Sequence, residues 1–151
     1  MKVGYRGDMA NVLFLCPHGA GKSVVAATYF RAAAARIGLP ANVQIGGPEP
    51  DEEIMPNVRA ALQNQGFSTC WEPRLVTRDD FENADIIVSI GCDIAALATD
   101  KPVVEWDVPL ISVDPTASMQ ALHELAEMLA RTIPLAATES DSQIETTVSS
   151  L

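Results

Sequence analysis

The sequence predicts an α/β fold: a three-layer sandwich in which a four-stranded parallel sheet lies between two layers of helices. Short apolar segments alternate along the chain with alanine-rich or amphipathic segments. This β-α-β-α order is typical of a parallel sheet with helices on both faces. One apolar segment, DIIVSIG at 85–91, is nearly all apolar. Such a run is expected of a strand that is buried on both faces.

The first predicted elements are a strand, a glycine-containing loop and a helix. NVLFLC at 11–16 is a short β-prone run, and SVVAATYFRAAAARIG at 23–38 is a helical pattern that ends at a glycine. ANVQIGG at 41–47 predicts the second strand. MPNVRAALQNQG at 55–66 predicts a helix, with a proline near its start and a glycine after its end.

The second half of the chain adds two strands and two helices. TRDDFENA at 77–84 predicts a short helix, which is followed by the strands at 85–91 and at 101–106 (KPVVEW). A last helix has apolar residues at three- and four-residue spacing. They are Met119, Leu122, Ala126, Leu129 and Ile133.

Pro134 is expected to end this last helix, because proline cannot continue the hydrogen-bond ladder. The residues after it are polar, rich in Thr and Ser, and without periodicity. We therefore expect a domain at residues 1–134 and a disordered tail at 135–151.

Composition and charge exclude several classes of function. A chain of 151 residues fits one domain, and a formal net charge of −10 makes nucleic acid an unexpected partner. The apolar runs are too short to span a membrane, and the N-terminus lacks the features of a secretory signal. We expect a cytoplasmic protein with no membrane partner. Three scattered cysteines and two distant histidines predict no disulfide framework, no metal site and no cofactor.

The octet CPHGAGKS at 16–23 departs by one residue from each of two phosphate-binding signatures. The nucleotide-binding loop G-x-x-x-x-G-K-[ST] would require a glycine where Cys16 stands. The Cys-x5-Arg-[ST] loop of cysteine phosphatases would require an arginine where Lys22 stands. The nucleotide interpretation also needs an acidic residue for magnesium after a buried strand, for which Asp93 is the candidate. We keep this interpretation as the third alternative.

The cysteine interpretation gives every part of the octet a role. Cys16 follows a predicted strand and is the expected nucleophile, whose reactive form is the thiolate. The Ser23 hydroxyl is expected to donate to its sulfur. Backbone N–H groups of the loop, together with the start of the next helix, would surround a phosphate or arsenate. The residues of this predicted oxyanion site are Pro17, His18, Gly19, Ala20, Gly21 and Lys22.

From residue 11 to 133 the chain resembles the low-molecular-weight protein tyrosine phosphatase superfamily, in particular its arsenate-reductase-like branch. Besides the octet, five segments occur in the order in which that branch carries similar ones. They are GGPEP, IMPNVRAALQNQGF, EPRLVTRDDFENADIIVSIGCD, VEWDVP and VDP. The resemblance implies a phosphotyrosine protein phosphatase I-like fold. It also implies a cysteine-dependent phosphatase or arsenate reductase that acts on arsenate or on a phosphorylated small molecule or protein.

The resemblance also implies a general acid near the end of the domain. In the family an aspartate followed by proline protonates the leaving oxygen, which corresponds to Asp114 before Pro115. Asp114 fits a helix N-cap equally well. Asp107 in EWDVP is the rival acid.

Two departures from the family bear on activity. Lys22 replaces an arginine whose planar guanidinium contacts two oxygens, whereas an ammonium is a point charge. The loss of one such contact costs about 2–4 kcal/mol, roughly a hundred- to a thousandfold in rate. Thiol-relay reductases have a second cysteine several residues after the position of Cys92, and this chain does not. Cys92 therefore remains as the candidate redox partner of Cys16, with a thiol reductant as the external partner.

A non-catalytic oxyanion-binding or regulatory module is the alternative from another class. In such a protein Lys22 would retain the ligand and would not need to support turnover.

Overall fold

The computed structural model describes residues 9–92 and 101–149. A four-stranded sheet forms its centre, with β1 (Ala10–Leu15), β2 (Ala41–Gly46), β3 (Ile86–Ile90) and β4 (Val103–Trp106). The strands lie in the order β2-β1-β3-β4, and all three neighbouring pairs are parallel. The predicted four-stranded parallel sheet is confirmed.

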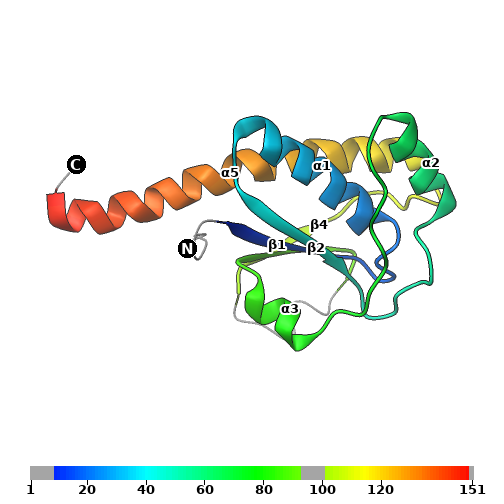
Figure 1. The fold of residues 1–151 in the computed structure, drawn as a ribbon, viewed down its shortest axis with the longest axis horizontal. Coiled ribbons are helices and arrows are strands. Elements are labelled where there is room, and N and C mark those ends of the chain that lie inside the picture. The colour runs from blue at the N-terminus through cyan, green and yellow to red at the C-terminus, as the bar shows by residue number, and fades with distance from the viewer. Residues whose placement is uncertain (1–8, 93–100, 150–151) are drawn as a thin grey trace.

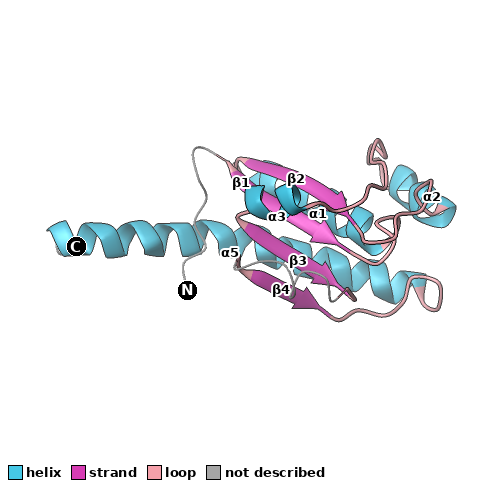
Figure 2. Cartoon of the chain, turned by 90° about the horizontal axis from the view of Figure 1, so that it is seen from below, coloured by secondary structure: helices cyan, strands magenta, loops and turns pink. Residues whose placement is uncertain are grey.

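Helices cover both faces of this sheet, as Figures 1 and 2 show from two directions. The helices α1 (Lys22–Ile37) and α5 (Pro115–Ser149) pack on one face, with α2 (Pro56–Asn64) near one end of α1. The short helix α3 (Arg78–Asn83) lies on the opposite face. The three layers of the predicted sandwich are therefore present, and the α3 layer is the thinner one.

Alternation along β1 produces two hydrophobic clusters. Val12 and Phe14 belong to the larger cluster on the side of α1 and α5, whereas Leu13 and Leu15 belong to a smaller cluster that includes Phe81 of α3. Successive side chains of a strand point to opposite faces, which explains this division. All five residues of β3 are buried, as its apolar sequence predicted.

The pairing registers bring three strand ends to one edge of the sheet. Leu15, the last residue of β1, lies opposite Gly46 of β2 and Ser89 of β3. The segments that leave these ends start with Cys16, Gly47 and Gly91. Ligands of open α/β sheets bind at this carboxyl edge. The fold therefore brings the octet to the place where a ligand is expected.

The last helix extends further than expected. Pro134 was predicted to end it, but α5 continues to Ser149 as one helix of 35 residues (Figure 1). A proline inside a helix removes one backbone hydrogen bond, and the following residues 135–149 contain no glycine and no further proline. The division into a domain at 1–134 and a tail stays a prediction. Among the helices of residues 9–92 and 101–149, none is both long and apolar enough to cross a membrane.

Candidate active site

A tight loop connects β1 to α1, and we call residues 16–22 the cysteine loop. Cys16 lies directly after β1, and its side chain is buried, with 4% of its surface exposed. The Gly19 N–H donates to the Cys16 carbonyl at 3.3 Å, so the chain turns back on itself within four residues. Gly19 has a φ of 59°, a conformation that residues with a side chain rarely adopt. Because the loop is short, α1 begins at Lys22, only six residues after Cys16.

Neighbouring segments hold the cysteine loop in this shape. Gly47, after β2, packs so closely that a Cβ added there would lie 2.5 Å from the Cys16 carbonyl oxygen and 2.9 Å from the Gly19 nitrogen. Both atoms belong to the backbone, so they cannot move aside as a side chain would. On the other side, the Met55 N–H donates to the Ala20 carbonyl at 3.0 Å. The loop is therefore clamped between two segments that follow β2.

Several N–H groups of the loop are left for a ligand. Pro17 has no N–H, and the Gly19 N–H is already donated to Cys16, so neither of these two predicted residues can offer an amide to an anion. The Cys16 N–H donates to the Gly46 carbonyl at 3.3 Å. Within the described part of the chain, the other four loop residues donate no backbone N–H to a protein acceptor. These are His18, Ala20, Gly21 and Lys22. Backbone N–H groups at a helix N-terminus are typical partners of an anion, so these four are the candidate oxyanion donors.

A pocket of about 400 Å³ opens over the cysteine loop, and we call it the active-site pocket. Gly21 belongs to its floor, where an added Cβ would lie 2.7 Å from the Met55 sulfur. The lining residues come from the cysteine loop, from the segment after β2 and from the segments after β3 and β4. They are Cys16, Pro17, His18, Ala20, Gly21, Lys22, Asp51, Met55, Gly91, Leu110, Ile111 and Ser112. The pocket has room for a tetrahedral oxyanion with a small organic group.

Ser23 contacts the sulfur of Cys16 through its hydroxyl group. Its Oγ lies 3.1 Å from the Cys16 Sγ, and its side chain is fully buried. When the sulfur is a thiolate it can only accept, so the hydroxyl must then be the donor. Ser23 lies in the first turn of α1, and its neighbour Lys22 begins the helix. With the thiol protonated, Cys16 is the donor to this oxygen, so the predicted role of Ser23 as a donor to the thiolate stays a prediction.

Lys22 borders the active-site pocket from the side of β3 and β4. Its Nζ lies 3.4 Å from the Val108 carbonyl oxygen, and a Cβ added at Gly91 would lie 3.7 Å from the same nitrogen. The side chain is half-buried and belongs to the pocket lining. Its ammonium therefore lies at the pocket wall. The contact with Val108 is long for a hydrogen bond, so an anion could displace it at little cost.

His18 and Asp51 form the mouth of the pocket. The His18 Nδ1 lies 2.8 Å from the Glu49 carbonyl oxygen and 3.6 Å from the Asp51 Oδ1. Both side chains are about half exposed, at 58% and 50%. The segment at 49–51 is tied to the loop by two more hydrogen bonds, from the Glu49 N–H to Pro17 and from the Asp51 N–H to His18, each at 3.1 Å.

The two predicted acids lie outside the pocket lining. The Asp114 Oδ1 accepts the Ala117 N–H at 3.1 Å, and its carbonyl accepts the Ser118 N–H at 3.0 Å, so this exposed residue caps α5. This is the N-cap that the sequence also allowed. Asp107 is exposed and does not line the pocket either. A catalytic role for Asp114 or Asp107 stays a prediction.

The candidate redox cysteine is close in sequence to the pocket but is not part of its lining. Cys92 is buried after β3, and its carbonyl accepts a hydrogen bond from the Ser89 hydroxyl. The residue before it, Gly91, does line the pocket. A redox role for Cys92 stays a prediction. Asp93, the candidate magnesium ligand of the nucleotide interpretation, lies outside the described residues.

Sequence reasoning missed three residues of this site. Gly47, Asp51 and Met55 all follow β2 and shape the pocket or its mouth. The Gly-Gly pair that ends the predicted second strand was a signal for close backbone packing, because glycine in a strand often marks such an approach. In residues 9–92 and 101–149, no group of three or more His, Cys, Asp or Glu residues could hold a metal ion.

Comparison with known proteins agrees with this geometry. Residues 11–106 match the model of the low molecular weight phosphotyrosine protein phosphatase family. The matched residues include the cysteine loop and all four strands, except for Ala10 at the start of β1. The chain belongs to this family. A Halobacterium salinarum relative named "Putative arsenate reductase" is 29% identical over 97 residues, which are 62% of this chain and 68% of the relative.

Solved structures of the low molecular weight phosphatase type share the fold. An arsenate reductase from Archaeoglobus fulgidus superimposes with a TM-score of 0.63 at 29% identity, covering 79% of this chain and 98% of that one. A thioredoxin-dependent arsenate reductase from Corynebacterium glutamicum gives a TM-score of 0.73 at 24% identity, covering 86% of this chain. This chain spans 64% of the corynebacterial protein. The matched family is one of phosphatases, and these neighbours show that the chain shares its fold.

Proposed function

We propose that the chain is a cysteine-dependent phosphatase or arsenate-reductase-like enzyme that binds phosphate or arsenate in its Cys-x5-Lys-Ser loop. One observation carries the proposal: within the described residues, four N–H groups of the loop between the buried Cys16 and the N-terminus of α1 have no protein acceptor. Such a site stabilises an oxyanion, and it also stabilises the thiolate that attacks it. The substrate class is a phosphorylated small molecule or protein, or free arsenate.

The proposed reaction begins with attack of the Cys16 thiolate on the phosphorus of the bound substrate. The sulfur–phosphorus bond forms while the bond to the leaving oxygen breaks, which gives a thiophosphate on Cys16. Water then attacks this intermediate, and phosphate leaves as the thiolate is restored. The Ser23 hydroxyl, 3.1 Å from the sulfur, stabilises the thiolate at both ends of the cycle.

Lys22 sets the expected level of activity. Its ammonium provides charge near the equatorial oxygens but lacks the planar fork of a guanidinium. We therefore expect turnover that is slow for this family.

Hydrolysis fits the described geometry better than an internal thiol relay. Cys92 does not line the active-site pocket, and the sequence offers no second relay cysteine after it. Water reaches an open pocket without any rearrangement. An arsenate reductase reaction would instead need an external thiol to attack the arsenylated Cys16, with the thiol oxidised as arsenic is reduced.

A non-catalytic oxyanion-binding module is the second candidate. Lys22 in place of arginine favours it, and so does the position of Asp114, which caps α5 and does not face the pocket. Both observations describe a site that holds an anion more readily than it turns one over. The nucleotide-binding interpretation has no comparable support, because the matched family is one of phosphatases.

The decisive test measures turnover of p-nitrophenyl phosphate by the wild type and by Cys16→Ser. We expect slow hydrolysis that Cys16→Ser abolishes. Binding of phosphate by both proteins without Cys16-dependent hydrolysis or thiol-dependent arsenate reduction would instead favour the binding module. A second titration with ATP and GTP, with and without magnesium, tests the nucleotide interpretation, and micromolar magnesium-dependent binding would support it.

Alkylation of each cysteine with iodoacetamide tests the thiolate directly. Cys70 is the internal control, since it is fully exposed and the pKa of its thiol is lowered by a hydrogen bond from Ser68 and by the Arg31 guanidinium. We expect phosphate or arsenate to protect Cys16 from labelling and to leave Cys70 unaffected. Equal labelling of both thiols with and without the anion would contradict the proposed site.

A further inference from the structure

Two chain segments border the mouth of the active-site pocket, one on each side of Cys16. The sheet order β2-β1-β3-β4 places the end of β1, and with it Cys16, between the segment that follows β2 and the segment that follows β4. Asp51 of the first segment and Leu110 of the second both line the pocket. The Asp51 side chain is 50% exposed and Leu110 is 58% exposed, so both lie where the pocket meets solvent.

The segment after β2 gives one side of the mouth a negative charge. Glu49, Asp51, Glu52 and Glu53 lie within five residues of sequence, and all four are exposed. Within residues 9–92 and 101–149, no lysine or arginine pairs with these carboxylates, and their one ion-pair contact is from Asp51 to His18 at 3.6 Å. The charge of this side is therefore available to a positively charged group of a ligand.

The segment after β4 gives the other side an aliphatic surface. Leu110 and Val113 are 58% and 76% exposed. The N–H groups of Val113 and Asp114 both donate to the Leu110 carbonyl, at 3.0 and 2.9 Å, so this segment forms a tight turn. Ile111 in the same turn is buried, and a Cβ added at Gly21 would lie 3.4 Å from its Cδ1. Exposed aliphatic side chains beside a pocket favour a ligand that covers them with apolar surface.

Both sides of the mouth are held against the cysteine loop. The contact of Ile111 with the Gly21 position holds the turn after β4. On the other side, the Glu49 N–H donates to the Pro17 carbonyl and the Asp51 N–H donates to the His18 carbonyl, each at 3.1 Å. A site whose walls are already in place binds its ligand with a smaller loss of conformational entropy. The difference between an acidic side and an aliphatic side is therefore a fixed property of the pocket.

We infer that the mouth selects a phosphorylated peptide segment with a basic residue on one side of the phosphorylated residue and an aliphatic residue on the other. Asp51 and Leu110 are the specificity-determining residues. A peptide fits this mouth because its flanking residues extend in both directions from the phosphate and reach both sides at once. Two different sides also favour one direction of the peptide chain. The inference rests on the proposed phosphatase reaction and narrows its substrate class.

The test measures kcat/KM of the wild type on three phosphotyrosine peptides. The first has lysine before the phosphotyrosine and leucine after it, the second has the reverse order, and the third has only alanine at these positions. We expect one order to exceed the alanine peptide by about tenfold and the reverse order by about fivefold. The two mixed peptides have the same charge and composition, so general attraction to an acidic protein cannot distinguish them. Equal rates on both orders would overturn the proposal.

Variants assign the two preferences to their residues, using peptides that keep only the lysine or only the leucine of the preferred order. Asp51→Asn should reduce the preference for lysine over alanine by about threefold and leave the preference for leucine, and Leu110→Ser should do the opposite. The lysine preference should also weaken in high salt, because exposed charges are screened. The readout is a ratio of rates within one variant, so it does not depend on how much of that variant is folded.

Two matched variants on α5 are the controls. Glu124→Gln removes an exposed carboxylate, and Met128→Ser removes an apolar residue that is as exposed as Leu110, at 57%. Neither residue lines the active-site pocket, so both preferences should stay as in the wild type. Wild-type preferences in Asp51→Asn and Leu110→Ser, or the same losses in the control variants, would overturn the assignment.

The two levels of proposal fail in different ways. A wild type with no Cys16-dependent turnover of the peptides or of p-nitrophenyl phosphate refutes the phosphatase reaction, and the peptide selection with it. Cys16-dependent turnover of p-nitrophenyl phosphate, with equal rates or no turnover on the three peptides, refutes only the selection of flanking residues.

Discussion

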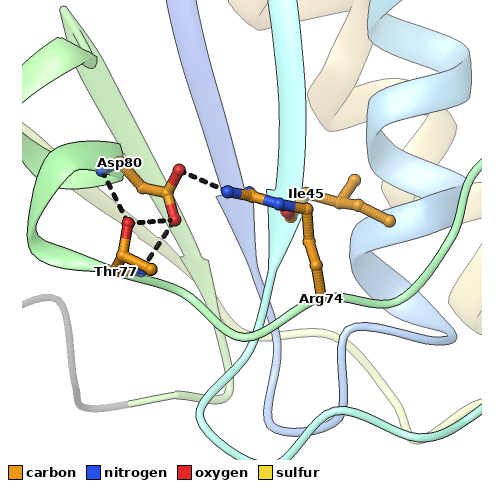
Figure 3. A network of polar contacts seen from close by, with 4 residues as sticks. All are labelled: Ile45, Arg74, Thr77 and Asp80. Atoms are coloured by element: carbon orange, nitrogen blue, oxygen red, sulfur yellow. Dashed lines mark hydrogen bonds and ion pairs between the residues drawn. The ribbon is translucent and has the colours of Figure 1, made fainter.

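The cysteine loop and the network around Arg74 are both polar regions beside β2. They differ in whether their hydrogen-bond donors have acceptors within the protein. In the network the Arg74 guanidinium donates to the Ile45 carbonyl at 3.0 Å and to the Asp80 carboxylate at 2.6 Å (Figure 3). Asp80 also accepts from the N–H and the hydroxyl of Thr77. In the cysteine loop, by contrast, four backbone N–H groups have no protein acceptor in the described chain.

The Arg74 network docks α3 on the sheet. Thr77 and Asp80 form a reciprocal capping box at the start of α3, and Arg74 links that box to Ile45 near the end of β2. Burial raises the pKa of Asp80, but the bonds from Arg74 and Thr77 outweigh it and hold the pKa below its usual range. The charged groups of the network bind one another and nearby backbone groups, so they stabilise the fold and offer few free hydrogen-bonding groups to a ligand.

This difference separates a structural polar cluster from a binding site more clearly than the number of charges does. The Arg74 network contains a full ion pair, whereas the walls of the cysteine loop contain mainly backbone amides. Satisfied groups contribute to stability, and unsatisfied groups that converge on one point favour a ligand. Mutations in the two regions should therefore separate stability from activity.

Gly47→Ala should give the largest effect on activity, because the added methyl group forces the backbone of the cysteine loop to change its conformation. The new methyl group would lie 2.5 Å from the Cys16 carbonyl oxygen, so backbone must shift. Displacement of a nucleophile by about 1 Å costs about 100-fold in rate. We expect at least that loss of p-nitrophenyl phosphate hydrolysis and a drop of about 1–3 kcal/mol in the free energy of unfolding.

Gly66→Ala is the matched control for this substitution. Gly66 has a φ of 87° but open space around it, so alanine should cost about 1 kcal/mol of stability. Turnover should be unchanged. Full activity in Gly47→Ala would contradict the close packing on which the loop geometry depends.

Lys22→Arg and Lys22→Ala give the next largest effects. Arginine restores a planar fork at the pocket wall and should raise kcat/KM on an aryl phosphate by up to about 100-fold. Alanine should weaken phosphate binding, measured by calorimetry, by about tenfold, because one charge is lost. Lys101→Ala, at a lysine that donates to the Glu82 carbonyl, is the control and should bind phosphate as the wild type does. Unchanged binding in both Lys22 variants would show that Lys22 does not contact the anion.

Asp80→Asn tests the Arg74 network and should change the stability of the fold without changing activity. Loss of the ion pair with Arg74 and of part of the capping box should cost about 1–2 kcal/mol at pH 7. Because the pKa of Asp80 is lowered in the folded protein, its contribution is present above the unfolded pKa and is lost as the pH falls through the folded value. Urea unfolding at pH 7 and at pH 3 should show a difference between the proteins that shrinks in acid. A pH-independent difference would contradict an electrostatic role, and phosphate binding should not change.

The sequence predicted the frame of the molecule because its signals are local. Apolar runs determined the four strands, and glycine, proline and Thr77 marked helix ends, all of which depend on neighbouring residues. The cysteine loop was predictable for the same reason, since its residues are consecutive. The lowered pKa of Cys70 could be predicted only in part: its main cause, a hydrogen bond from Ser68, is local, whereas the Arg31 guanidinium comes from α1.

Contacts between distant segments account for the rest of what the sequence did not show. Asp51 meets His18 only because the segment after β2 folds over the loop. The Lys22 ammonium meets the Val108 carbonyl across 86 residues. The continuation of α5 beyond Pro134 shows the reverse case, in which a strong local signal did not decide the helix end.

Asp114 gives the smallest expected effect, and it separates a capping residue from a catalytic one. Its Oδ1 accepts the Ala117 N–H at 3.1 Å at the start of α5. Asparagine caps helices about as well as aspartate, so Asp114→Asn should keep the free energy of unfolding, whereas Asp114→Ala should lose about 1 kcal/mol. If Asp114 only caps the helix, Asp114→Asn should also keep kcat/KM on phenyl phosphate within about twofold. A selective loss of about 100-fold on that substrate in Asp114→Asn, with normal stability, would mean that Asp114 leaves the helix cap and enters the pocket during turnover.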